Sequence, residues 1–462
     1  MDEKKTLLTA HGSNGAGPVT TTHPIPRPWP AVGHLPYLAA DNLGFFRTVC
    51  QGSTAPLVPI RMGTVLAYVV TSRTLAQDLL AKSYALFDSP ALHPAARHML
   101  GVSLPMITGE EHQDRRHLMQ GHFTVRQIRQ GCLESVRTSV RDELGTWPTG
   151  RVMDLQPSLS RLSFFVTTKA LARLDFSPHQ AQDFRSWTST ALHMVMCEAM
   201  LPPAASSGRM PTPIRARSRW AVSRMQRMVE GLLAPYLAGA KTPVPGSTME
   251  TMLTLRGSMG ERKAAEAIRD DYLAMIVAGY DTTSGALGWF CHEVSRRPDI
   301  QDRLHRNEDG TYLGQVITEA LRFHPPASLV TRFSDEPMRL EGFDIPAQTP
   351  LIMSINAFHH DPEIFERPDV FDPDRWAEGK GKEERQMLLP FGVGPRRCIG
   401  EHFAYLAMRE ILGAITRRWV LVPAGRRPVR RTRLRAVVQP RHLPMVLAEH
   451  RCPEALSAPG SP

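Results

Sequence analysis

The chain has 462 residues, and 55 lysines and arginines against 45 aspartates and glutamates give it a formal charge of +10. Hydrophobic residues make up 42% and charged residues 22% of the chain, which excludes a disordered or fibrous protein and leaves material for a large core. The six scattered cysteines show no Cys-x-x-Cys spacing, which argues against a disulfide framework and a structural zinc site.

The N-terminal part of the chain predicts a flexible tail. Residues 1–22 are rich in threonine, glycine and serine without periodicity, and a stiff proline-rich segment follows. No secretory signal is present, and no apolar run approaches the ~18 residues that span a bilayer. Residues 23–462 contain no internal repeat or long linker, so we expect one domain in a cytoplasmic monomer without a membrane span.

The elements change in character along the chain. Residues 57–70 are rich in β-branched side chains and predict a hairpin, whereas residues 72–301 show mainly helical periodicity. Loops are expected at residues 90–108, 148–152, 201–213 and 242–247. Short strands and turns follow after about residue 325, with a second β-like patch at residues 434–447. The pattern predicts a mainly α fold with a smaller β-rich part.

An apolar helix is expected over residues 272–290, and its centre is poor helix material. Gly279 costs about 1 kcal/mol relative to alanine, and Asp281 and Thr282 are also unfavourable in a helix interior. A threonine hydroxyl can bond a carbonyl one turn back, which opens a groove where a diatomic ligand and water fit. The alternative is a packing notch against a neighbouring helix.

Two pairs of charged residues lie at helical spacing. Glu319 and Arg322 are three residues apart, and His112 and Arg116 are four apart, so each pair shares a helix face. Such pairs are common on exposed helices, and neither pair identifies a site by itself. The adjacent His359 and His360 are expected in a surface turn.

The stretch at residues 391–400 is the most informative part of the sequence. Its glycines and proline predict a tight, irregular turn, and the apolar spacing after Gly400 predicts a helix. Cys398 is thus held just before a helix N-terminus, where backbone N–H groups and the neighbouring Arg396 and Arg397 favour a thiolate. A thiolate facing a flat space is what an axial haem-iron ligand requires.

The arrangement Phe-x-x-Gly-x-Arg-x-Cys-x-Gly resembles the haem-binding signature of the cytochrome P450 superfamily, in its soluble, bacterial-type members. The resemblance implies the fold of that family, with haem b between the long central helix and the helix after the cysteine loop. It makes Cys398 the axial ligand of the iron. It also implies that haem is contacted by residues of the cysteine loop and the central helix, namely Phe391, Arg396, Gly400, Ala278 and Gly279.

The same resemblance assigns roles to charged residues elsewhere. Asp281 and Thr282 match the acid and alcohol pair that feeds protons to bound dioxygen, and they are the implied catalytic residues. Glu319, Arg322 and Arg375 match a buried structural network near the cysteine loop. The implied partners of the haem propionates are His112, Arg116, Arg332 and Arg396.

The resemblance also implies an apolar, methionine-containing substrate pocket, which suits a hydrophobic small molecule. Its expected members are Leu92, Met99, Val102, Leu192, Met196, Met275 and Leu329. We expect a monooxygenase that hydroxylates or otherwise oxidises a terpenoid or other polycyclic natural product, with a fatty-acyl chain as the next choice. Peroxygenases, rearranging enzymes and haem sensors remain the alternatives.

We expect electrons to come from a separate protein, because the 64 residues after Cys398 are too few for a flavin or iron–sulfur domain. The basic balance suits an acidic ferredoxin or flavodoxin supplied by an NAD(P)H reductase. The arginine pairs concerned are at residues 417–418, 426–427 and 430–431. A nucleic-acid partner is not expected, since no aromatic platform or recognition motif accompanies these arginines.

Overall fold

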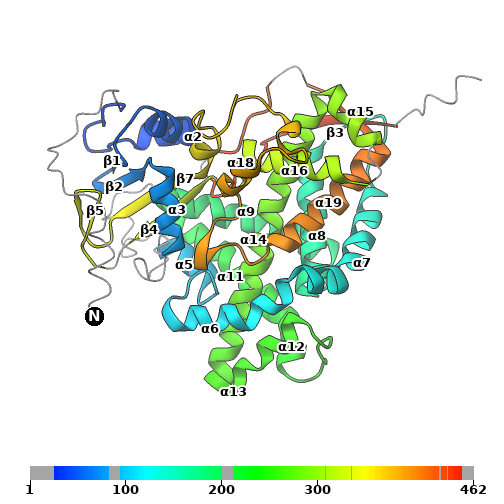
Figure 1. The fold of residues 1–462 in the computed structure, drawn as a ribbon. Coiled ribbons are helices and arrows are strands. Elements are labelled where there is room, and N and C mark those ends of the chain that lie inside the picture. Colours follow the sequence, from blue (N-terminus) through cyan, green and yellow to red (C-terminus); the bar gives the residue numbers. More distant parts are fainter. Residues whose placement is uncertain are drawn as a thin grey trace, which may run out of the picture.

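The computed structural model describes residues 25–82, 94–199, 212–306, 309–333, 336–425, 428–433 and 435–449. Helices form most of the molecule, and a smaller β-rich part lies beside them (Figure 1). This arrangement confirms the expected fold class. The expected tail at residues 1–22 lies outside the described residues.

The helices are spread over the whole described part of the chain. The first half contains α2 (Leu35–Gln51), α3 (Arg73–Ala81), α5 (Pro94–Leu100), α6 (Gly109–Gln120), α7 (Val125–Leu144), α8 (Leu155–Val166), α9 (Pro178–Ala199) and α11 (Pro213–Leu237). The second half contains α12 (Thr248–Leu253), α13 (Leu255–Met259), α14 (Glu261–Ser295), α15 (Pro298–Arg306), α16 (Thr311–Phe323), α17 (Ile355–His359), α18 (Lys382–Met387) and α19 (Glu401–Arg418). Shorter helical turns are η1 (Gly121–Phe123), the π-helical η2 (Thr167–Ala172), η3 (Pro373–Trp376) and η4 (Gly394–Arg396).

The strands of the described residues form three small sheets. The first has the order β1 (Leu57–Met62), β2 (Val65–Val70), β7 (Pro350–Ser354) and β4 (Leu329–Phe333), with β2 and β7 parallel and the other pairs antiparallel. The second is antiparallel, in the order β3 (Val152–Asp154), β9 (Pro444–Glu449) and β8 (Trp419–Pro423). The third pairs β5 (Met338–Leu340) with β6 (Phe343–Ile345). The expected hairpin at residues 57–70 is confirmed by the pairing of β1 with β2.

Local sequence explains where several helices begin. Ser72, Thr124 and Asp154 precede α3, α7 and α8, and each side chain accepts a hydrogen bond from a backbone N–H of the first turn. Such caps satisfy donors that have no partner within the helix. The expected loop at residues 90–108 contains a short helix, α5, whose Met99 is buried in the core. The expectation of a loop is wrong for Pro94–Leu100, where burial of Met99 favours a helix that the local sequence pattern does not indicate.

The helix α14 is buried along most of its length. The helix spans Glu261–Ser295 and is longer than the predicted 272–290. The polar residues in its first turns gave no apolar pattern from which the earlier start could be predicted. It belongs to one hydrophobic cluster whose members run from Met99 to Leu447. Within the described residues, no helix is long and apolar enough to cross a membrane. A helix buried on nearly all sides can hold polar residues at fixed positions in the interior.

Candidate functional site

The loop before α19 holds Cys398 by backbone geometry. Gly392 and Gly394 have φ angles of +70° and +73°, which favour glycine, and a Cβ on Gly394 would overlap the backbone carbonyl of Leu80. The N–H of Cys398 donates to the carbonyl of Phe391 over 2.9 Å and closes the loop. The helix α19 begins at Glu401 with Gly400 as its N-cap, as the sequence predicted. Cys398 itself is exposed within this loop.

The electrostatics around Cys398 differ from the expectation. Although Cys398 is exposed by surface area, the protein atoms crowded around its sulfur disfavour the charged form and raise the pKa of the thiol, while the Gly400 N–H, Arg116 and Arg397 lower it. Glu401, in the first turn of α19, also raises this pKa and holds Arg397 in an ion pair of 2.6 Å. The protein groups alone therefore do not produce the thiolate that the sequence suggested. A coordinating metal ion deprotonates such a thiol outright.

Three arginines and one histidine gather near this loop. Burial, with Arg396 and Arg116 next in importance, lowers the pKa of His112 to about 4. Burial followed by Arg396 lowers the pKa of Arg332 to about 10. The Nε atom of Arg332 is buried without a hydrogen-bond partner among the described residues. The four residues expected to bind propionates thus lie near one another.

The centre of α14 presents Ala278 to an open space. Ala278 is exposed and Thr282 is half-buried, although most neighbouring residues of the helix are buried. The Thr282 hydroxyl donates to the Ala278 carbonyl over 2.6 Å, as expected from its position one turn later. Gly279 instead faces η2, where a Cβ would approach Thr167 Cγ2 to 2.7 Å. For Gly279, the structure therefore supports the packing notch that the sequence left open.

Asp281 lies on the buried side of the same turn and is 6% exposed. Gln439 donates from Nε2 to Asp281 Oδ1 over 2.7 Å and to the Asp281 carbonyl over 2.9 Å. Burial raises the pKa of Asp281, while Arg435 and the Gln439 hydrogen bond lower it. The second carboxyl oxygen, Oδ2, is buried without a hydrogen-bond partner among the described residues. Gln439 and Arg435 were missed in the sequence, where no local signal connects them with a residue about 150 positions earlier.

Glu319 and Arg322 of α16 form a fully buried network, each with 0% side-chain exposure. Two hydrogen bonds of 2.8 and 2.9 Å join them, and Arg322 also donates to the carbonyls of His359, Pro368 and Val370. The Glu319 carboxylate accepts from the Asp372 N–H and the Trp376 indole. Arg375 approaches Glu319 at 3.9 Å, which is an ion pair without a hydrogen bond. These contacts tie α16 to the segment that leads toward the cysteine loop.

The expectation of a surface turn at His359 and His360 is wrong, because both residues are buried. His359 Nε2 accepts from the Leu389 N–H over 2.9 Å, while Nδ1 lies 3.1 Å from the carbonyl oxygen of Arg322. Burial, followed by His360, holds the pKa of His359 well below its usual range. A neutral imidazole with its proton on Nδ1 therefore connects the Arg322 network to the start of the cysteine loop.

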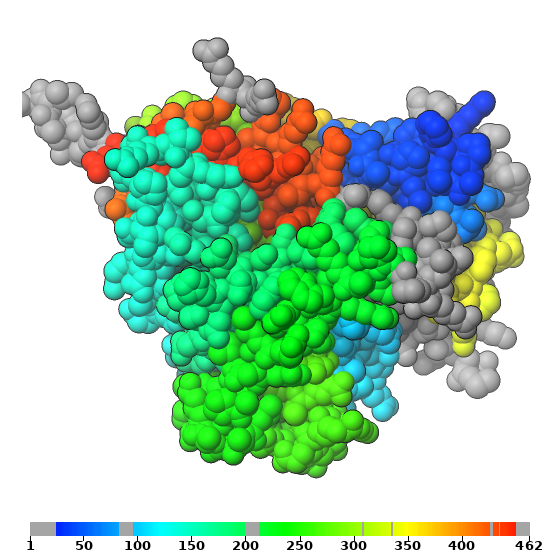
Figure 2. Space-filling model, turned by 180° about the vertical axis from the view of Figure 1, so that it is seen from behind, coloured from blue at the N-terminus to red at the C-terminus, as the bar shows by residue number. Residues whose placement is uncertain are grey.

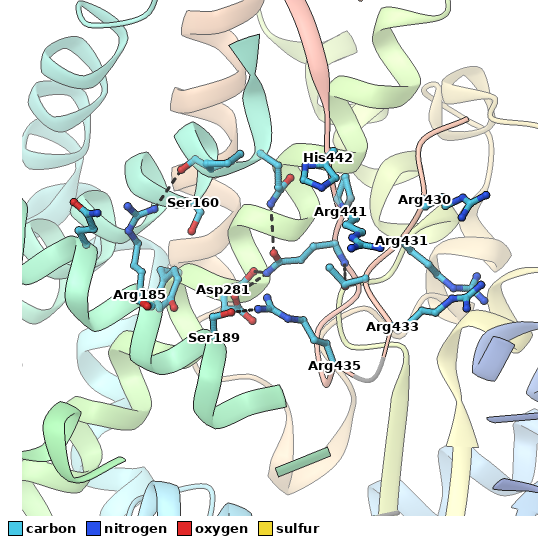
Figure 3. A pocket seen from close by; sticks show the side chains of 18 of the residues that line it. Ser160, Arg185, Ser189, Asp281, Arg430, Arg431, Arg433, Arg435, Arg441 and His442 are labelled. Carbon is cyan, nitrogen blue, oxygen red and sulfur yellow. Dashed lines mark hydrogen bonds between the residues drawn. The ribbon is translucent and has the colours of Figure 1, made fainter. Parts of the chain in front are cut away.

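A cavity of about 1080 Å³ borders Asp281 and is strongly polar. Its walls come from α2, α8, α9, α14 and the C-terminal segment around residues 430–442. In Figure 2 that red segment lies between the blue N-terminal residues and the cyan and green helices. Figure 3 shows Arg435 reaching toward Asp281 and Ser189 from this segment. The cavity gives the acid of α14 a connection to polar surroundings.

The residues expected to form an apolar substrate pocket do not line this polar cavity. Met99 is buried in the core, Val102 is 42% exposed, and Leu192, Met196, Met275 and Leu329 are half-buried. Leu92 lies outside the described residues. The polar cavity is thus a different space from the expected substrate pocket. In the part of the chain that the structure describes, no cluster of histidine, cysteine and acidic residues forms a metal site.

Comparisons with known proteins agree on one family. The sequence model of the family described as Cytochrome P450 matches residues 23–448. The chain is 28% identical to cyclooctat-9-en-7-ol 5-monooxygenase of Streptomyces melanosporofaciens, over 88% of this chain and 94% of that protein. It is 27% identical to pentalenene oxygenase of Streptomyces avermitilis, over 90% and 94% of the two chains.

Solved structures agree on the fold. The haem domain of cytochrome P450DA superposes with a TM-score of 0.76 at 20% identity, covering 92% of this chain and 97% of that one. A six-coordinated cytochrome P450 of Thermus thermophilus superposes with a TM-score of 0.68 at 23% identity, covering 89% and 99%.

Proposed function

The chain belongs to the cytochrome P450 family and is a cytochrome P450 monooxygenase, and we propose that its substrate is a terpenoid or a similar polycyclic hydrocarbon skeleton. Two observations support the substrate class. The relatives named above include a pentalenene oxygenase and a cyclooctat-9-en-7-ol monooxygenase. Apolar side chains such as Met275 also lie half-buried on α14 beside the exposed Ala278. Such walls suit an apolar substrate.

The residues around Cys398 fit a haem with two propionates. Cys398 is exposed at the end of its loop, and Ala278 is exposed in the middle of a buried helix. The buried Arg332 Nε lacks a partner among the described residues, which fits a bound carboxylate. We propose that the protein binds haem b, which Cys398 would hold through its iron and His112, Arg116, Arg332 and Arg396 through its propionates. When bound, this group supplies activation of dioxygen and transfer of oxygen to a C–H bond.

Asp281 and Thr282 are proposed to hold and move protons. The Thr282 hydroxyl donates its hydrogen bond to the Ala278 carbonyl. Its oxygen can therefore still accept a hydrogen bond from a proton donor or a water molecule on the open side of α14. Asp281 lines the polar cavity, its buried Oδ2 has no partner among the described residues, and burial favours the protonated carboxyl. A carboxyl group that lies between a polar cavity and the helix centre can take a proton from one side and release it toward the other.

The proposed electron donor is an acidic ferredoxin or flavodoxin with its NAD(P)H reductase. Arg397 directly precedes Cys398, and its side chain is 54% exposed. Arg137 of α7 is exposed as well and pairs with Glu410 of α19. Exposed arginines attract an acidic partner electrostatically. Arg430 and Arg431, which the sequence grouped with this role, line the cavity beside Asp281.

The substrate proposal is tested by difference spectroscopy of the haem-loaded protein. Terpene hydrocarbons should shift the ferric haem spectrum at low concentration, and fatty acids of similar size should do so only at higher concentration. A preference for polar ligands would contradict the proposal. With the terpene that binds best, Thr282→Ala should consume NADPH with about 100-fold less product, the lower end of the range for a lost proton-transfer group. Full coupling of NADPH use to product would remove Thr282 from the proton path.

A further inference from the structure

The cavity beside Asp281 concentrates positive charge. Among the described residues, six arginines contribute to its lining, against two aspartates, Asp41 and Asp281. The arginines are Arg185, Arg430, Arg431, Arg433, Arg435 and Arg441. The pKa of Arg431 is lowered by burial and then by Arg433, so these two cations lie close enough to repel each other. Gathering like charges costs free energy unless an anion offsets it.

Three of these arginines have side chains without any hydrogen-bond or ion-pair partner among the described residues. Arg431 pairs with Asp41, Arg435 donates to Ser189, and Arg185 donates to the carbonyls of Ala181 and Pro157. Arg430, Arg433 and Arg441 make no side-chain hydrogen bond or ion pair with another described residue. Figure 3 shows Arg430, Arg431 and Arg433 grouped on the C-terminal segment. Their donors are thus available to a ligand.

The chemistry of these donors selects the ligand. A guanidinium presents a planar fork of N–H groups that matches two oxygens of a phosphate, and several forks around one space match several phosphoryl oxygens. A cavity of about 1080 Å³ is large enough for a small molecule. We propose that this cavity binds a diphosphate group, either as inorganic diphosphate or as a diphosphate ester, through Arg430, Arg433 and Arg441 and the neighbouring Arg431.

The site is connected to the helix centre through Gln439. Gln439 belongs to the same C-terminal segment as the arginines, lines the same cavity and donates to Asp281. Arg435 of this segment reaches toward Asp281 (Figure 3). A bound anion would offset the positive potential of Arg435 and so favour the protonated carboxyl of Asp281. Occupancy of the cavity would therefore act on the group that we propose as a proton carrier. Binding itself does not depend on that role.

The test is isothermal titration calorimetry of the haem-loaded protein with sodium diphosphate and, separately, with ADP, at constant ionic strength. The test variant combines Arg430→Gln, Arg433→Gln and Arg441→Gln. The control variant combines Arg126→Gln, Arg129→Gln and Arg262→Gln, which removes the same charge from exposed positions outside the cavity. Circular dichroism and the haem spectrum check that each variant is folded.

We expect saturable binding of diphosphate to the wild-type protein. Loss of even one charge-assisted hydrogen bond corresponds to about 10-fold in affinity, so the test variant should bind at least that much more weakly and the control variant within about twofold. Tighter binding of ADP than of diphosphate would identify an ester as the ligand, and the reverse would identify the free anion. No saturable binding of either compound, or equal losses in both variants, would overturn the proposal.

Discussion

Replacement of Glu319 by glutamine should destabilise the protein strongly, although the side chain keeps its size. Glu319 and Arg322 are both 0% exposed, and the change leaves the Arg322 guanidinium buried without an ionic partner. Removing one member of a buried ion pair costs about 3–5 kcal/mol. The carbonyls of His359, Pro368 and Val370 still accept hydrogen bonds from Arg322, so we expect the lower end of this range.

The assay is urea unfolding of the haem-loaded protein, followed by circular dichroism. With a slope of about 3 kcal/mol per molar urea, the midpoint should fall by about 1 M. The matched control is Asp374→Asn, which breaks the pair between Asp374 and Arg303, whose side chains are 49% and 43% exposed. An exposed pair contributes about 0–1 kcal/mol, so its midpoint should change by about 0.3 M at most. Equal midpoints for the two variants would refute the role given to burial.

Two further predictions concern buried carboxyl groups. Burial, with Arg115 opposing it, raises the pKa of Asp271 to about 6 from 3.8, so its contribution to stability is present below pH 4 and is lost as the pH rises through 6. Between pH 4 and 7, the free energy of unfolding of the wild-type protein should therefore fall by up to about 3 kcal/mol more than that of Asp271→Asn. The same pH dependence in both proteins would contradict this. Gln439→Leu should raise the pKa of Asp281 further, because it removes the hydrogen bond of 2.7 Å, whereas Gln301→Leu should not. Infrared titration of the carboxyl band, assigned with Asp281→Asn, measures this, and an unchanged titration would exclude Gln439 as the group that sets this pKa.

The sequence was informative where local pattern decides the structure. The hairpin at residues 57–70, the helix before and after Asp281 and the helix after Gly400 follow from side-chain periodicity and glycine positions. The position of Cys398 before a helix N-terminus follows from the same signals. The resemblance to a known family supplied the roles that periodicity does not give.

Contacts between distant residues could not be predicted in this way. Gln439 meets Asp281 across 158 positions, and no pattern near either residue indicates the pair. His359 looked like a surface residue because histidine pairs are polar, yet its two hydrogen bonds to the backbone allow burial. The raised pKa of the Cys398 thiol depends on burial and on Glu401, which only the packed structure reveals.

The ligation of haem iron by Cys398 is tested most directly by the spectrum of the reduced protein with carbon monoxide. The wild-type protein should show the red-shifted Soret band of a thiolate ligand, and Cys398→Ala should lack it. Cys132→Ala is the matched control, since Cys132 is buried and its thiol donates to the Ala170 carbonyl. That control should keep the band. Persistence of the red-shifted band in Cys398→Ala would contradict the assignment of Cys398 as the axial ligand.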